Sequence, residues 1–94
     1  MDRKELYTKL LNLYGEKQIV IAIEELSELQ KELCKALRYN YNYENIVEEI
    51  ADVEIMLEQI KICFEISEEE IEEMKKLKIK RTKERLGIWI AKKK

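Results

Sequence analysis

Apolar residues recur at three- and four-residue spacings along almost the whole chain, which is the period of an amphipathic helix. The pattern predicts helices over four stretches, about residues 2–14, 17–39, 45–64 and 68–86. In the third stretch the inward positions are predicted to be Ile46, Ile50, Val53, Leu57, Ile60 and Phe64. Proline is absent and only two glycines occur, so few residues would interrupt these helices. We therefore expect an all-α four-helix bundle.

Turn and capping residues set the expected helix ends. Gly15 would end the first helix, and the asparagine-rich stretch 40–43 would separate the second from the third, because Asn tolerates the left-handed conformation. Ser67 followed by Glu70 forms a capping box that starts the fourth helix. Gly87 would end it at a C′ position. The chain is then a single domain over residues 1–94, with a core over 17–86 and an apolar, then basic, tail over 87–94.

The third helix carries apolar residues on a second side as well. These are Val47, Ala51, Ile55 and Ile62. A four-helix chain of 94 residues would leave part of this surface and the tail exposed, so we expect a homo-oligomer, either a homodimer or a homotetramer. The alternative is that these are single apolar residues scattered over the surface of a monomer.

Composition restricts the location and the chemistry. No apolar run is long enough to span a membrane and the N-terminus has no signal-peptide pattern, so we expect a cytoplasmic protein with no membrane partner. Cys34 and Cys63 form no metal-binding spacing and are expected to be buried, reduced thiols. Histidine is absent. Any metal site must therefore rest on oxygen ligands.

Charge is divided unevenly along the chain. Residues 75–94 hold ten Lys or Arg and one acid, whereas the net charge of the whole chain is −2. An acidic body with a basic end is typical of a nucleic-acid-binding arm. It is equally typical of a site that needs acids for a metal and cations for phosphates.

Two acidic motifs stand on successive helices. Glu24-Glu25-Leu26-Ser27-Glu28 lies in the second helix and Glu48-Glu49-Ile50-Ala51-Asp52 in the third. The pairs Glu25/Glu28 and Glu49/Asp52 are each spaced i, i+3 and share a helix face. On a helical wheel Glu49 falls inside the apolar stripe, with Asp52 and Glu25 at the stripe margins. Acids on a solvated face, the common case, would lie opposite that stripe.

Carboxylates turned toward a core need cationic partners or a shifted pKa. Four acids at one helix–helix seam would repel one another unless divalent cations neutralised them, and hard oxygen donors suit Mg²⁺, with Mn²⁺ as a substitute. The competing interpretation is that Lys and Arg side chains from other helices pair with these acids.

The fourth helix has a basic face. Lys78, Arg81 and Arg85 lie within about 60° of one another and continue a strip begun by Ile71 and Met74, so they are expected to turn toward the bundle. Such a triad could bind phosphates. The competing interpretation is a solvated surface of i, i+4 ion pairs.

With these motifs in order, the chain resembles the MazG-like branch of the all-α NTP pyrophosphatases, over about residues 18–86. The superfamily also includes the all-α dUTPases and the phosphoribosyl-ATP pyrophosphatases, but the absence of His argues against the last branch. The resemblance implies an Mg²⁺-dependent hydrolase that cleaves a nucleoside triphosphate to the monophosphate and pyrophosphate. It implies metal ligation by Glu25, Glu28, Glu49 and Asp52, a nucleotide contact for Gln18, and phosphate binding by Lys78, Arg81 and Arg85.

Two other interpretations of the chain remain. A helical interaction module whose basic end binds nucleic acid is one, although the resemblance makes a nucleic-acid partner the less favoured choice. A structural helical oligomer without ligands is the other.

Overall fold

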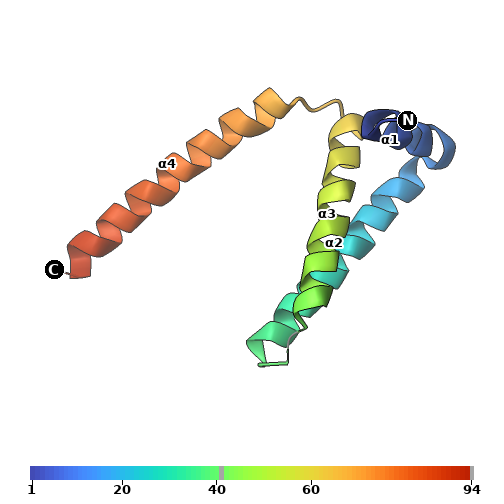
Figure 1. Ribbon diagram of the computed structural model, residues 1–94. Coiled ribbons are helices and arrows are strands. Elements are labelled where there is room, and N and C mark those ends of the chain that lie inside the picture. Colours follow the sequence, from blue (N-terminus) through green and yellow to red (C-terminus); the bar gives the residue numbers. More distant parts are fainter. Residues whose placement is uncertain (41, 94) are drawn as a thin grey trace.

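The computed structural model of the chain describes residues 1–40 and 42–93. Four helices make up nearly all of it (Figure 1): α1 (Arg3–Tyr14), α2 (Glu16–Leu37), α3 (Tyr43–Cys63) and α4 (Glu68–Lys93). The described residues contain no strand, and the prediction of an all-α, four-helix protein is confirmed. Tyr41 of the predicted turn and Lys94 of the predicted tail lie outside the described residues. Among the four helices, none combines the length and the apolar character that crossing a membrane requires.

The capping box at the start of α4 is confirmed. The Glu70 backbone N–H donates to Ser67 Oγ over 3.1 Å, and the Ser67 backbone N–H donates to Glu70 Oε2 over 2.8 Å. Asp2 caps α1 in a simpler way, because its Oδ1 accepts from the Glu5 backbone N–H at 2.8 Å. Side-chain oxygens thus satisfy backbone donors that the first helical turn leaves without partners.

The C-terminus of α3 closes in a Schellman motif without glycine. Glu65 adopts a left-handed conformation with φ 55°, and the Ile66 N–H donates to the Lys61 carbonyl over 2.8 Å. The same pattern closes α2, where Tyr39 takes φ 60° and the Asn40 N–H returns to the preceding turn. The turn after α2 was predicted to use Asn for the left-handed position. Tyr39 occupies it instead, because the hydrogen bonds that close the helix end decide which residue adopts the left-handed conformation.

The two glycines have different roles. Gly15 has φ 55° and ψ −126°, and it joins α1 directly to α2. Gly87 lies inside α4, so the prediction that the helix ends at Leu86 is wrong, and residues 87–93 continue the helix. A single glycine costs a helix only about 1 kcal/mol, and the residues after Gly87 include no proline to stop it.

The centre of the molecule is the antiparallel pair of α2 and α3 (Figure 1). Its buried positions on α2 are Gln18, Ala22 and Glu32, with Glu25, Leu29 and Ala36 half-buried. Those on α3 are Val53, Met56 and Gln59, with Glu49, Asp52 and Ile60 half-buried. These residues recur every three to four positions and form one seam, which we call the α2–α3 seam. α1 packs across one end of the pair and buries Tyr7, which is 5% exposed.

Much of the predicted core is exposed. Ile50, Leu57 and Phe64 were expected to point inward, but they are 43%, 41% and 59% exposed. They lie about 100° around α3 from the seam. The matching stripe on α2 is Ile23, Leu26, Leu33 and Leu37, all exposed. Because the helices are antiparallel, both stripes face the same side of the pair, which we call the apolar side.

Both cysteines contradict the prediction of burial. Cys34 and Cys63 are exposed free thiols. Cys34 falls outside the narrow strip of α2 that α3 covers. Cys63 is on the seam face of α3, four residues after the buried Gln59, but it is the last residue of the helix and lies beyond the Gln18–Gln59 pair, so its side chain stays in contact with water.

α4 projects away from the rest of the chain (Figure 1). Among the described residues it packs against none of the other three helices. The expectation that its basic face turns toward the bundle is therefore wrong within one chain. The radius of gyration is 17.6 Å, whereas a compact chain of this length would have about 12 Å. Within one chain, therefore, α1, α2 and α3 pack together and α4 does not.

We predict that Gly87→Ala stabilises α4. An added Cβ would meet nothing within 4 Å, and alanine is favoured over glycine in a helix interior by about 1 kcal/mol. Hydrogen exchange of amides 84–93 should slow roughly fivefold. If Gly87 were instead a left-handed C′ residue, the substitution would destabilise the helix end. Gly15→Ala is the matched comparison, and its positive φ should make the same change destabilising.

Candidate functional site

Three carboxylates meet in the α2–α3 seam. Glu25 comes from the middle of α2, and Glu49 and Asp52 come from successive turns of α3. Each offers one oxygen atom, and these oxygens all lie within 4.8 Å of one another. The helical-wheel placement of these acids at the core stripe is confirmed, because all three are half-buried rather than solvated.

Burial and mutual repulsion both act on these groups. Burial raises the pKa of Glu25, and hydrogen bonding and repulsion with Asp52 raise it further. Burial likewise raises the pKa of Glu49, followed by repulsion from Asp52 and Glu28. Raised values mean that the folded chain holds the negative charge of these two groups unfavourably.

One oxygen of the cluster has no partner. Glu49 Oε2 is fully buried and accepts no hydrogen bond from any described residue. The ion pairs found in the described part of the chain join other residues, such as Arg3 with Glu58 and Lys35 with Glu32. Pairing of the cluster with Lys or Arg is therefore not what the described residues show. A cation held between the three carboxylates would satisfy the buried oxygen and remove the repulsion, so the residues fit a hard divalent ion.

The other acids of the two motifs lie outside this cluster. Glu28 is exposed, yet close enough to Glu49 for its charge to raise the pKa of that residue. Glu24 and Glu48 are exposed on the same two helices. Of the four predicted metal-ligating acids, the structure therefore brings three together and leaves Glu28 at the edge.

Gln18 lies two helical turns from Glu25 in the same seam. Its Nε2 donates to Gln59 Oε1 over 2.8 Å, and the side chains of both residues are buried, with Gln18 6% and Gln59 4% exposed. The predicted nucleotide-contacting amide is thus engaged inside the protein. Sequence reasoning did not single out Gln59. The signal was available, because Gln59 follows Asp52 and Met56 at seven- and three-residue spacings on the same face.

The basic triad is on one face of α4, as predicted. Lys78, Arg81 and Arg85, together with Thr82, line a shallow depression of about 190 Å³. All four residues are exposed. The structure does not bring this depression to the acidic cluster, because α4 packs against no other helix of the described chain.

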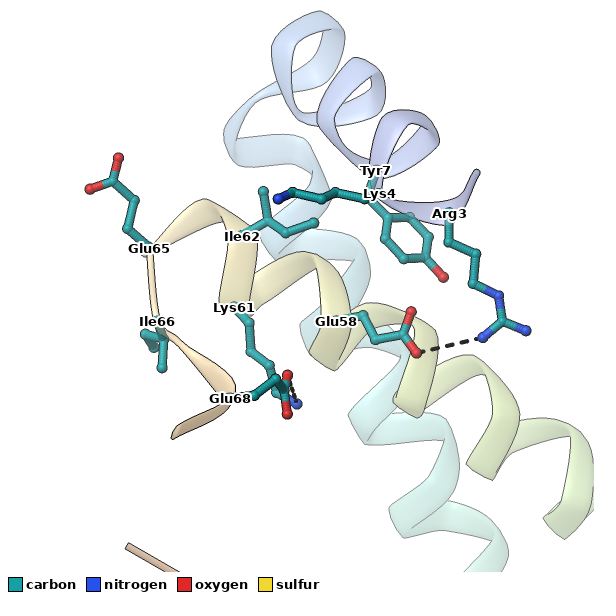
Figure 2. Close-up of a pocket in the computed structure, with 9 residues that line it drawn as sticks. All are labelled: Arg3, Lys4, Tyr7, Glu58, Lys61, Ile62, Glu65, Ile66 and Glu68. Atoms are coloured by element: carbon teal, nitrogen blue, oxygen red, sulfur yellow. Dashed lines mark hydrogen bonds and ion pairs between the residues drawn. The ribbon is translucent and has the colours of Figure 1, made fainter. Parts of the chain in front are cut away.

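A separate cavity of about 480 Å³ lies where α1 meets the end of α3 (Figure 2). Figure 2 shows Arg3 directed at Glu58 and Lys61 beside Glu68. The Arg3 Nη1–Glu58 Oε1 distance is 3.8 Å and the Lys61 Nζ–Glu68 Oε1 distance is 3.0 Å. Hydrogen bonding to Glu58 raises the pKa of Tyr7. None of the clustered acids lines this cavity. The ion pairs at this cavity join α1 to α3 and α3 to the start of α4. The sequence pattern did not single out Tyr7.

Comparison with known proteins adds no family to this picture: no family model, no curated protein and no solved structure matches the chain. The assignment of chemistry therefore depends on the residues themselves.

We predict that the metal-free protein loses stability as the pH rises above the ordinary glutamate value of 4.5. Glu25 and Glu49 have raised folded-state pKa values, so their protonated forms favour folding. That contribution is fully present below the unfolded-state value and disappears as pH increases through the folded-state values. Urea unfolding between pH 4.5 and 8 with a chelator present measures it.

Glu49→Gln should flatten this profile, because the amide keeps the size of the side chain and removes its charge. The exposed Glu24→Gln is the matched control and should leave the profile unchanged. A metal-free wild-type protein that gained stability across this range would contradict the charge balance described for the seam.

Proposed function

We propose that this chain is a divalent-cation-dependent nucleoside triphosphate pyrophosphohydrolase, which converts an NTP or dNTP to the monophosphate and pyrophosphate. The observation that carries the proposal is the meeting of Glu25, Glu49 and Asp52 in a seam with one buried carboxylate oxygen unsatisfied. The order of the two acidic motifs and the basic helix, which resembles the MazG-like branch, supports the choice of reaction.

In this proposal Glu25, Glu49 and Asp52 hold Mg²⁺, or Mn²⁺ in its place. The ion would lower the pKa of a bound water and polarise the α-phosphoryl group. Glu28 is exposed beside Glu49 and suits the role of proton acceptor for the attacking water. Gln18 and Gln59 would act at a distance, because their hydrogen bond fixes the register of α2 against α3 near the acids.

Lys78, Arg81 and Arg85 would neutralise the charge that develops on the departing pyrophosphate. Arginine suits this role because its planar guanidinium can donate two parallel hydrogen bonds to one phosphate.

Self-association forms part of the proposal. The apolar side of the α2–α3 pair is open to water, and Ile23 and Leu33 on it are 58% and 50% exposed. Exposed apolar surface of this extent favours burial against a second copy, in a homodimer or a homotetramer.

We predict that Asp52→Asn abolishes Mg²⁺-dependent pyrophosphate release while keeping the helical fold. The loss should exceed the roughly 10–100-fold effect of residues that only orient a metal ligand. A panel of canonical and modified NTPs, assayed separately for pyrophosphate and for orthophosphate, measures the reaction and identifies the bond that is cleaved.

Glu24→Gln is again the matched control, since Glu24 is exposed beside the cluster without belonging to it. Turnover by Asp52→Asn at the wild-type rate would remove the metal-site assignment. Release of orthophosphate alone would keep the metal site but reject the reaction.

One observation favours a second function. α4 extends from the acidic body as an exposed helix whose C-terminal part is basic, because residues 75–94 hold ten Lys or Arg and one acid. Such a basic segment can bind the phosphates of DNA or RNA. That function predicts an affinity that falls steeply with salt and decreases when Lys80 and Lys83 are replaced by Gln. In the pyrophosphohydrolase these two replacements should leave turnover unchanged, because both side chains point away from the triad's face.

A further inference from the structure

The helix α4 has no helical neighbour in the described chain that could stabilise it. An isolated helix in water is marginal, and most helices in proteins are stabilised by the packing of an apolar face against another surface. α4 is 26 residues long and packs against none of the other three helices. A surface that covers one of its faces is therefore expected.

One side of α4 carries an apolar stripe that the proposed pyrophosphohydrolase does not use. The members of this stripe recur at three-, four- and seven-residue spacings and span about 100° of the helix, as in an amphipathic helix. They are Ile79, Leu86, Trp89 and Ile90. All four side chains are exposed.

Cations border this apolar stripe on both sides. Lys83 lies along one edge, and Lys78 and Arg85 lie along the other. The one acid in this part of the helix, Glu84, lies about 160° from Leu86 around the helix axis. Long Lys and Arg side chains can lie along an apolar surface while their charged ends reach a polar layer above it. The arrangement is typical of a helix that lies in the interface of an anionic lipid bilayer.

Trp89 distinguishes a lipid surface from a nucleic acid. It is the one tryptophan of the chain, and Lys93 Nζ lies 5.1 Å from the centroid of its ring. Tryptophan favours the bilayer interface because its ring is apolar and its N–H is polar. Nucleic-acid phosphates would be bound by the cations alone and would leave Ile79 and Leu86 in water. The stripe and the cations together therefore favour the bilayer.

The charges of the chain are separated in space as an anionic surface requires. Residues 75–94 hold ten Lys or Arg and one acid while the whole chain has a net charge of −2, so residues 1–74 carry −11. This acidic body would be repelled by an anionic bilayer over a distance of about 8 Å at physiological ionic strength. α4 projects away from α1, α2 and α3 (Figure 1), so its basic part can reach a surface that the acidic body does not touch.

We propose that residues 75–93 of α4 lie on the surface of anionic phospholipid bilayers, with the apolar stripe in the bilayer interface and the cations at the lipid phosphates. The expectation of no membrane partner was based on the lack of a spanning segment and of a signal peptide, and a helix that lies on the surface needs neither. This binding does not depend on the proposed catalytic function.

The single tryptophan allows a direct test on the full chain. Trp89 emission is recorded while the protein is titrated with vesicles of phosphatidylcholine alone or of an equal mixture of phosphatidylcholine and phosphatidylglycerol. With the mixed vesicles we expect the emission to shift to shorter wavelength and to be quenched by brominated lipid chains. Binding to phosphatidylcholine alone should be weaker by roughly tenfold or more, because several cations contribute to binding at the anionic surface.

Ile79→Glu should weaken binding to the mixed vesicles by roughly tenfold or more, because it places a charge in the apolar stripe. Ile88→Glu is the matched control. Ile88 lies nine residues further along, on the opposite side of the helix, and the two isoleucines are similarly exposed, at 53% and 58%. The control should change binding less than about threefold, because its charge is held away from the surface and screened.

Equal weakening by the two variants would show that charge alone holds the helix to the vesicles, and it would overturn the proposal. Binding without a shift of Trp89 emission, or no binding to the mixed vesicles, would overturn it as well. A DNA duplex that shifts Trp89 emission when the mixed vesicles do not would assign the helix to nucleic acid instead. None of these readouts needs a nucleoside triphosphate, so an inactive protein that binds the vesicles would reject only the proposed function.

Discussion

The structure depends on how α2 and α3 meet, because the strip through which they pair is polar at its centre. Ala22, 1% exposed, and Met56 provide close apolar contact, but a buried glutamine pair lies on one side of them and the carboxylates of Glu25 and Asp52 on the other. Helix pairs usually bury their apolar stripes. Here the acids take those positions, so the pairing is at its best only when the charge of the cluster is compensated.

The presence of acids in the α2–α3 seam explains why apolar residues of these helices are exposed. With acids in the seam, the apolar stripes of both helices are left on one side of the pair. α4 carries its cations on a helix that packs against no other helix of the described chain and meets α3 through the Lys61–Glu68 ion pair. The single chain thus leaves two features without a counterpart: an exposed apolar surface and the negative charge of the acidic cluster. In the proposed function, association with a copy of the same chain would cover the exposed apolar area, and a divalent ion would compensate the charge of the acidic cluster.

Sequence periodicity predicted what depends on local order, namely the four helices, the Ser67 capping box and the seam position of Glu49. It failed where an outcome depends on partners. The wheel identified the faces of α4 but not that α4 packs against no other helix of the described chain, which leaves Lys78 exposed. It also placed Leu57 in a core that only a second helix layer could form. Gly87 was assigned a helix end because a glycine in mid-helix and a glycine at C′ look alike in sequence.

Anomalous diffraction from crystals grown with Mn²⁺ would show whether the seam carboxylates share a divalent ion. Mn²⁺ shares the preference of Mg²⁺ for oxygen ligands. We expect one anomalous peak or two adjacent ones within about 2–2.5 Å of oxygens from Glu25, Glu49 and Asp52. Clustered carboxylates with no anomalous peak between them, or with Lys or Arg nitrogens in its place, would contradict it.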